Sequence, residues 1–367
     1  MNSPGSELPY VTIISGGVGT RLWPRSRRSS PKQLIGLAAG RSLIQTTLER
    51  MLPLTSPDRV FVVTIGDQQD AIRAQLPEIP PENVIAEPEG RNTAMAIGLA
   101  VLHVAAADPN ALMISVGSDH FIGDNEAYRN TLRAAAAAAD DGAHLLTVGI
   151  APASPDTGYG YIHRGEVVAT HAGVDIYRVL AFKEKPALDV TRRYFESGEY
   201  LWNGNYFIWR VSAALAAYAE FVPDIRAEMD SVTAAIGTDG YEPALAAAYS
   251  RVRRAPIDTA IIEKAGNVLT VPGHFPWVDI GTWAGAYEIA EEQEGNFRTG
   301  SLAGKVLFVD SSGCLVDSHD RAVAVVGLED IVIVDTEDAL LVCSRDKAQL
   351  VGEVVGRLPG EDLEQLL

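Results

Sequence analysis

The chain has 367 residues, of which 47% are hydrophobic, and a formal net charge of −18. This length suits one large domain plus a smaller one, and the negative charge without a long Lys/Arg block argues against nucleic acid or anionic membranes as partners. The two cysteines, Cys314 and Cys343, cannot form a disulfide framework, and we see neither a signal peptide nor a membrane span. We therefore expect a cytoplasmic protein.

Strand-like and helix-like segments alternate over the first three quarters of the chain. The strand-like segments are short, apolar and often β-branched, whereas the helix-like segments are longer and several are rich in alanine. Such alternation predicts a Rossmann-like, doubly wound, mostly parallel α/β sheet. The expected strands are 10–14, 60–65, 111–116 and 145–150, and the expected helices include 68–76, 93–107 and 134–139.

The alternation fades after about residue 290. The polar, glycine-containing segment EEQEGNFRTG (291–300) indicates a linker. We therefore expect a Rossmann-like domain over 1–292 and a small all-β domain over 293–367, with a partial left-handed β-helix as one form of it. Its role would be packing or oligomerisation, for instance in a homodimer. Its expected strands are 305–309, 314–316, 322–326, 331–334 and 339–343, followed by a helix at 348–357.

A glycine-rich segment, SGGVGTRLWP (15–24), directly follows the first expected strand. Its glycines can turn sharply and expose N–H groups, which form a nest for an anion such as phosphate. Arg21 and Lys32 bracket the segment and could hold a polyphosphate, although an ordinary surface turn is equally compatible with this segment alone. A dinucleotide-binding turn would require glycine where Leu22 stands, which disfavours an NAD-type dehydrogenase.

Two aspartates follow expected strands in distant parts of the chain. Asp119 comes after strand 111–116, and Asp279 follows the aromatic segment FPWV. Each could simply cap a turn, but two carboxylates converging at the carboxyl edge of a sheet would suit Mg²⁺, which prefers oxygen ligands. For the same reason we assign the neighbouring His120 a structural role.

A series of motifs along the chain resembles the sugar-1-phosphate nucleotidyltransferases, and the LWP and PKQ variants resemble the branch that guanylylates mannose 1-phosphate. Small departures occur, including Ser15 where alanine is usual and Val-Gly-Ser before Asp119. The motifs are SGGVGTRLWP with PKQ (15–33), EPEGRNTAMAI (87–97), GSDHFI (117–122), TGYGYI (157–162), FKEKP (182–186), WNGNYFIW (202–209), PIDTAIIEK (256–264) and WVDIGTW (277–283).

The resemblance implies that a mannose 1-phosphate oxygen attacks the α-phosphorus of GTP in line, giving GDP-mannose and pyrophosphate with Mg²⁺ as cofactor. No Ser, Cys or His nucleophile is then needed, and catalysis consists of positioning and charge neutralisation. The implied residues are Arg21, Lys32 and Lys185 for catalysis, Gly16, Gly17, Gly19, Thr20, Glu87, Asn92 and Ser118 for the nucleotide, Gly160, Glu184 and Asn203 for the sugar phosphate, and Asp119 and Asp279 for the metal.

Two other interpretations remain open at this point. The first is a transferase for another base or sugar. The second is a non-catalytic, nucleotide-sugar-binding regulatory module. The presence of every expected charged residue favours an enzyme, because a degenerate module would be expected to lack at least one. Since the chain ends at Leu367, we expect no added sugar-isomerase domain and a single activity.

Overall fold

The structure is a computed structural model that describes residues 8–37, 40–140, 142, 144–299, 305–318 and 320–367. We predicted that the N-terminal segment contains no signal peptide. Residues 1–7 of that segment lie outside the described residues. In the described part of the chain, no helix combines the length and apolar character needed to cross a membrane.

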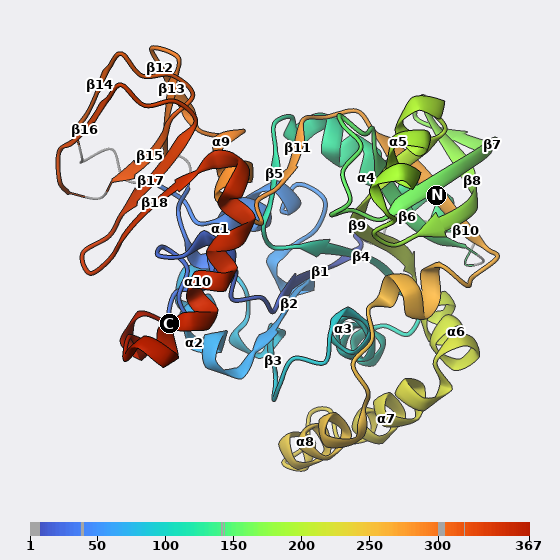
Figure 1. Cartoon of the computed structure of the whole chain (residues 1–367). Helices are drawn as coiled ribbons and strands as arrows, with labels where there is room; N and C mark the ends of the chain where they lie inside the picture. Colours follow the sequence, from blue (N-terminus) through green and yellow to red (C-terminus); the bar gives the residue numbers. More distant parts are fainter. Residues whose placement is uncertain (1–7, 38–39, 141, 143, 300–304, 319) are drawn as a thin grey trace.

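Among these residues, nine strands form one central sheet in the order β3-β2-β1-β4-β9-β6-β10-β8-β7 (Figure 1). Strands β3, β2, β1 and β4 are mutually parallel, as is the pair β6 and β10. Pairings of β9 and β8 with their neighbours are antiparallel, so the mostly parallel sheet that we predicted is mixed beyond β4. The strands are β1 (Tyr10–Ser15), β2 (Val60–Ile65), β3 (Val84–Glu87), β4 (Leu112–Gly117), β6 (Leu145–Ile150), β7 (Tyr161–His171), β8 (Val174–Lys183), β9 (Tyr200–Arg210) and β10 (Val268–Gly273).

Helices cover both faces of this sheet. Because side chains alternate along a strand, Val11 and Ile13 of β1 join one apolar cluster with α1, α2 and α4, whereas Tyr10 joins another with α3, α6, α7 and α8. Helix α3 forms over the predicted residues, is buried along most of its length, and lies between the sheet and α6–α7 (Figure 1). The helices are α1 (Leu43–Met51), α2 (Gln69–Gln75), α3 (Thr93–Ala107), α4 (Asn125–Ala139), α5 (Leu188–Ser197), α6 (Val211–Phe221), α7 (Pro223–Thr233), α8 (Tyr241–Arg251), α9 (Trp283–Tyr287) and α10 (Val351–Arg357).

The C-terminal unit winds in parallel coils. Strands β13, β15 and β17 stack in parallel in one sheet, and β14 pairs in parallel with β16 in a second sheet, as expected for a β-helix. The antiparallel strands β12 and β18 close the first sheet at its two edges. The strands are β12 (Glu291–Gln293), β13 (Asn296–Thr299), β14 (Val306–Val309), β15 (Leu315–Ser318), β16 (Val323–Val326), β17 (Ile331–Asp335) and β18 (Leu340–Ser344).

The predicted linker over 291–300 is wrong. Strands β12 and β13 form a hairpin there, and Glu294 and Gly295 make its turn with φ angles of 54° and 73°. Two consecutive residues with positive φ are what a tight hairpin turn requires. The predicted boundary between 292 and 293 consequently lies within β12.

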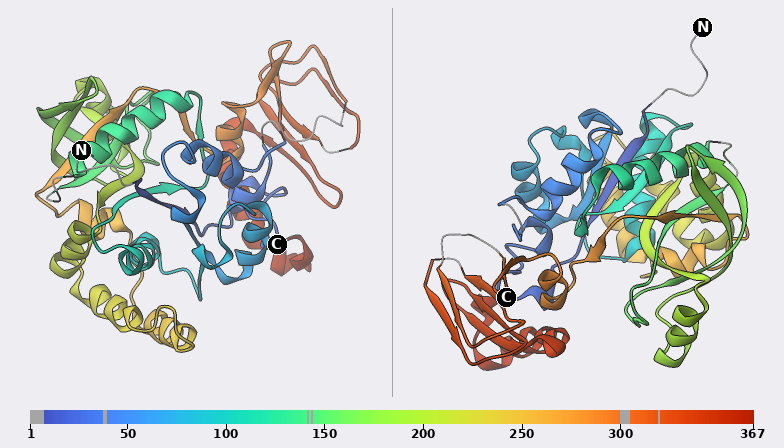
Figure 2. Two further views of the ribbon diagram at one scale, coloured as in Figure 1. Left: turned by 180° about the vertical axis from the view of Figure 1, so that it is seen from behind. Right: turned by 90° about the horizontal axis from the view of Figure 1, so that it is seen from above.

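The C-terminal unit packs directly on the segment that follows β1 (Figure 2). Leu22 and Trp23 share one apolar cluster with Leu315 of β15 and Val351 of α10. Trp283 of α9 also belongs to this cluster, and its indole N–H donates to the Trp23 carbonyl at 2.9 Å. The glycine-rich segment is therefore held between the two parts of the molecule.

Candidate active site

The carboxyl ends of β1, β3 and β4 meet at one edge of the sheet, where they border a pocket of about 480 Å³. This is the edge at which open α/β sheets bind ligands. Segments from the antiparallel half, around β9 and after β8, complete the walls. Ten of the predicted residues line the pocket: Gly16, Gly17, Lys32, Glu87, Asn92, Ser118, Asp119, Glu184, Lys185 and Asp279. The remaining five lie outside its lining: Gly19, Thr20, Arg21, Gly160 and Asn203.

The glycine-rich segment leaves β1 and crosses over the Lys32 side chain. Gly19 has a φ of +76°, and a Cβ added to it would lie only 2.6 Å from Cβ of Lys32, so glycine is required there. At Gly17 an added Cβ would meet no described atom within 4 Å, which leaves its backbone open to a ligand. Thr20 begins the short 3₁₀ turn Thr20–Leu22, which carries Arg21.

Lys32 lies between the two predicted metal ligands. Its ammonium forms an ion pair with Asp119, and both side chains are largely buried. Burial alone would lower the pKa of Lys32, but the carboxylates of Asp119 and Asp279 outweigh it and hold that pKa above its ordinary value. Burial would likewise raise the pKa of Asp119, yet Lys32 keeps it below its usual range. Opposite charges are thus concentrated at one point of the pocket.

A small antiparallel ribbon brings the two aspartates together. Strand β11 (Trp277–Asp279) pairs with β5 (His120–Ile122) so that Asp279 lies opposite His120, the residue after Asp119. The His120 ring makes a 2.8 Å hydrogen bond to the Tyr206 hydroxyl and is buried, which agrees with the structural role we predicted. The ribbon therefore explains how two carboxylates from distant parts of the chain face the same ammonium.

This donor set fits a divalent cation such as Mg²⁺. Among the described residues, no group of three or more His, Cys, Asp or Glu side chains could hold a metal on its own. Two carboxylates are nevertheless what Mg²⁺ commonly takes from a protein when substrate phosphates and water supply its other ligands. Asp119 and Asp279 would hold the cation. The Lys32 ammonium supplies a further positive charge next to these two carboxylates.

Glu87 and Asn92 form the wall of the pocket beyond β3. The Glu87 carboxyl group is buried, which raises its pKa to about 7, and it accepts a 2.9 Å hydrogen bond from the Tyr249 hydroxyl. Asn92 caps α3, with its side chain accepting from the Thr93 N–H at 2.7 Å. Tyr249 lies in α8, and the sequence analysis missed it because it belongs to none of the motifs.

Glu184 and Lys185 reach the pocket from the turn after β8. Their side chains pair at 3.0 Å, with Lys185 mostly exposed. Lys185 has a φ of 42°, a conformation that costs a non-glycine residue on the order of 1–3 kcal/mol and is often found at functional sites. This backbone conformation directs an ammonium to the pocket rim next to the Glu184 carboxylate.

Two predicted sugar-site residues have other neighbours than expected. The structure places Asn203 behind the pocket wall, 2% exposed, where its NH₂ group donates to Asp258 at 2.7 Å and to Asn205 at 3.0 Å. Its carbonyl oxygen accepts from Thr147, so contact with a hydroxyl would require breaking an existing bond. A Cβ added to Gly160 would lie 2.6 Å from the Glu184 carboxylate, so this glycine makes room for Glu184.

Asp258 is a pocket residue to which the sequence analysis assigned no role. It lies in a π-helical turn (Asp258–Ile262), a distortion that is frequent at functional sites. Burial and the neighbouring Glu184 carboxylate raise the pKa of Asp258 to about 6. Asp258 and Glu184 therefore form a carboxylate pair on the side of the pocket away from β3.

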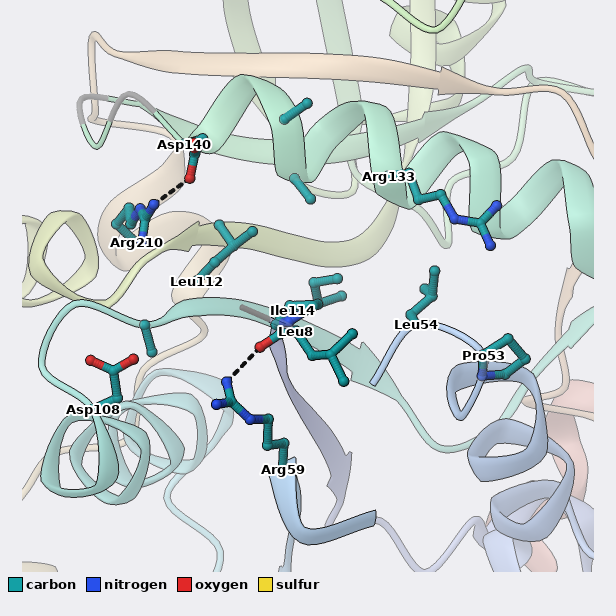
Figure 3. A pocket seen from close by; sticks show the side chains of 14 residues that line it. Leu8, Pro53, Leu54, Arg59, Asp108, Leu112, Ile114, Arg133, Asp140 and Arg210 are labelled. Carbon is teal, nitrogen blue, oxygen red and sulfur yellow. Dashed lines mark hydrogen bonds and ion pairs between the residues drawn. The ribbon is translucent and has the colours of Figure 1, made fainter. Parts of the chain in front are cut away.

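A second cavity, of about 620 Å³, lies where α4 passes over β4 and β9 (Figure 3). Its three arginines already have partners in the protein: Arg59 donates to the Leu8 carbonyl, Arg210 pairs with Asp140, and Arg133 pairs with Glu126. None of the residues predicted for the site lines it. Size alone therefore does not make it the functional site.

The sheet-edge pocket, with its glycine-rich segment and paired carboxylates, is that of a nucleotidyl transferase, and the family model described as nucleotidyl transferase matches residues 10–295. A second model, a MannoseP isomerase/GMP-like beta-helix domain, matches residues 304–358 and confirms the β-helix. A mannose-1-phosphate guanylyltransferase from Klebsiella pneumoniae is 35% identical over 94% of this chain and 72% of its own length. One from Escherichia coli (strain K12) is 36% identical over 96% of this chain and 74% of its own length. The chain belongs to the mannose-1-phosphate guanylyltransferase family.

A solved structure supports the same conclusion. A Thermus thermophilus protein described as a mannose-1-phosphate geranyltransferase has a TM-score of 0.85 and 32% identity over 96% of this chain and all of its own. A Helicobacter pylori protein described as a mannose-6-phosphate isomerase has a TM-score of 0.59 and 24% identity. The match covers 74% of this chain and all of that protein, so the two share the fold.

Proposed function

We propose that the protein transfers GMP from GTP to α-D-mannose 1-phosphate in the cytoplasm, forming GDP-mannose and pyrophosphate. The supporting observation is the cluster of Lys32, Asp119 and Asp279 at the carboxyl edge of parallel strands, directly below the glycine-rich segment. That arrangement provides positive charge and a site for Mg²⁺ where a triphosphate would lie.

The reaction that we propose is an in-line displacement. An oxygen of the sugar phosphate forms a bond to the α-phosphorus of GTP, and the bond between that phosphorus and the bridging oxygen of pyrophosphate breaks. Asp119 and Asp279 would hold Mg²⁺, which supplies charge neutralisation at the phosphates. Arg21 and Lys32 would stabilise the departing pyrophosphate, and Lys185 would orient the sugar phosphate.

Base and sugar would be read on opposite sides of the pocket. Guanine presents two donors, N1–H and the 2-amino group, which an ionised Glu87 beside Tyr249 can accept. Glu184 and Asp258 can accept from sugar hydroxyls, with Asn203 holding Asp258 in place. Adenine carries no hydrogen at N1 and no 2-amino group, so it would offer the buried Glu87 carboxylate no donor in addition to Tyr249.

The test is a matrix of nucleoside triphosphates and sugar 1-phosphates with Mg²⁺, in which pyrophosphate release is measured. We expect GTP with mannose 1-phosphate to be the best pair. A different best pair would leave the transferase class intact and change the substrate. Binding of nucleotide sugars without pyrophosphate release from any pair would instead support the regulatory module.

We also propose that the protein forms a homodimer through the β-helix. The two-stranded sheet of β14 and β16 exposes apolar side chains, with Leu307 63% and Val326 62% exposed. Exposed apolar patches of this kind are typical of association surfaces. Light scattering coupled to size exclusion should give the dimer mass for the natural chain and the monomer mass for Leu307→Asp with Val326→Asp. A monomeric natural chain would refute the proposal.

A further inference from the structure

The segment after the β-helix contacts the glycine-rich segment at several points. Arg21 Nη1 donates to Oε1 of Gln349 at 2.8 Å, although 328 residues separate the two in the chain. The indole N–H of Trp23 donates to the carbonyl of Leu366 at 2.9 Å. A Cβ added to Gly352 would lie 3.4 Å from Cγ of Arg21, so α10 packs closely on the arginine stem.

The other side of Arg21 faces Asp279, one of the two residues that we propose hold the metal. A Cβ added to Gly281 would lie 3.4 Å from Nη2 of Arg21 and 3.7 Å from Oδ1 of Asp279. The guanidinium therefore lies between Gln349 on one side and the turn that carries Asp279 on the other. Gln349 is firmly placed in turn, because its neighbours Ala348 and Val351 are buried in the cluster that joins the two parts of the molecule.

We propose that Gln349 is a positioning residue that holds Arg21 in the orientation needed to bind the pyrophosphate part of the nucleotide. The inference rests on the proposed role of Arg21 in the site. Arginine has a long side chain with several rotatable bonds, and Arg21 and Gln349 are both exposed here. A neutral amide acceptor fixes this side chain without cancelling its charge, whereas a carboxylate in the same place would compete with phosphate for it.

The C-terminal unit consequently contributes to the chemistry as well as to packing. A side chain from its own 3₁₀ turn (Arg345–Leu350) completes the surroundings of a residue on the other domain. Loss of one hydrogen bond to a charged group corresponds to roughly a tenfold change in an equilibrium or rate constant. The Kd for pyrophosphate should change by about this factor, because Arg21 faces the turn that carries Asp279, where we propose that the phosphates bind.

The experiment measures the Kd for pyrophosphate with Mg²⁺ by calorimetry on the full chain, together with KM values in the reverse reaction. We expect Gln349→Ala to weaken pyrophosphate about tenfold while the KM for GDP-mannose stays unchanged. Gln349→Glu should weaken pyrophosphate at least as much, because it keeps the acceptor but neutralises Arg21. The matched control is Glu353→Ala, which alters an exposed side chain of α10 and should behave like the natural chain.

A double-mutant cycle separates positioning from a general structural effect. In an Arg21→Ala background, Gln349→Ala should have no further effect on pyrophosphate affinity. Additive losses, or an equal loss of affinity for GDP-mannose, would overturn the inference while leaving the proposed function intact. Natural pyrophosphate affinity in Arg21→Ala itself would overturn the role of Arg21 and this inference with it. Because calorimetry requires no turnover, the inference is tested even if the proposed reaction is wrong.

Discussion

The two sides of the pocket that we propose for phosphate and for sugar, called the phosphate side and the sugar side below, are built on different principles. On the phosphate side, Lys32 pairs with Asp119 and faces Asp279, so a metal ion and phosphates would have to replace this ion pair when they bind. On the sugar side, Asn203 links Asp258 to its neighbours through hydrogen bonds that are already complete. The first side thus depends on bound charge to reach its working arrangement, whereas the second is set in advance. Substitutions should affect the two sides in correspondingly different ways.

The largest effect should come from the carboxylates on the phosphate side. Asp119→Asn and Asp279→Asn keep the size of the side chain but remove its charge, so each should lower kcat by roughly 10²-fold or more. The measurement is turnover at saturating Mg²⁺ with the melting temperature recorded in parallel. Asp67→Asn, at an exposed carboxylate, is the control. Near-normal turnover in either site variant would remove that residue from the metal site.

The two cations Arg21 and Lys32 should come next. Arg21→Ala and Lys32→Ala should each lower kcat/KM by roughly 10- to 10²-fold, because charge on the leaving pyrophosphate would no longer be neutralised. Lys32→Arg should rescue only in part, since a planar guanidinium cannot replace the compact ammonium that pairs with Asp119 and faces Asp279. Steady-state kinetics on the three variants decides the matter. If both alanine variants match the natural chain, the segment is an ordinary turn.

A smaller, pH-dependent effect should arise at Glu87. Its buried carboxyl group has a pKa of about 7, and only the ionised form can accept both guanine donors. The KM for GTP should therefore rise as the pH falls below 7, approaching about tenfold per pH unit. Glu87→Gln should have a high KM for GTP that no longer follows this titration. An identical pH profile in the two proteins would exclude Glu87 from base recognition.

The same raised pKa has the opposite effect on folding. Burial penalises the ionised form, so the contribution of Glu87 to the free energy of unfolding should decrease as the pH rises from the ordinary carboxyl range through about 7. Chemical denaturation of the natural chain and Glu87→Gln across this range would measure the difference. Substrate affinity and stability should therefore change in opposite directions with pH at this residue.

The smallest effect should appear on the sugar side. Glu184→Gln removes one acceptor charge but leaves the Asn203–Asp258 hydrogen bond in place, so the KM for mannose 1-phosphate should rise roughly 3- to 10-fold. The KM for GTP should change little. Paired saturation curves for the two substrates test this. A larger rise for GTP than for the sugar would contradict the division of the pocket into two sides.

The sequence brings several of the residues proposed for the phosphate side to the pocket because short, contiguous motifs carry them. A strand followed by SGGVGT, and a second strand followed by Asp119, place their residues at the sheet edge through topology alone. Tyr249 and Gln349 are different, since each contacts its site residue, Glu87 or Arg21, from far away in the chain. Nothing in their local sequence signals that contact.

The remaining differences concern hydrogen bonding and turn chemistry. Asn203 has the donor and acceptor that a sugar site needs, but only the fold reveals that Thr147, Asn205 and Asp258 already use them. The hairpin β12–β13 was missed because its strands are polar and its turn uses Glu-Gly, whereas Asn-Gly is the stronger signal for such a turn.

The contact between Trp23 and Leu366 has a consequence for how the protein is made. Chains emerge from the ribosome N-terminus first, and domains generally fold as units in that order. The glycine-rich segment therefore emerges well before Gln349 and Leu366, which contact it. A nascent chain can assemble the central sheet and its pocket while Arg21 still lacks these C-terminal contacts. If Gln349 positions Arg21 as we propose, this part of the site is completed only after residues 349–366 have been synthesised.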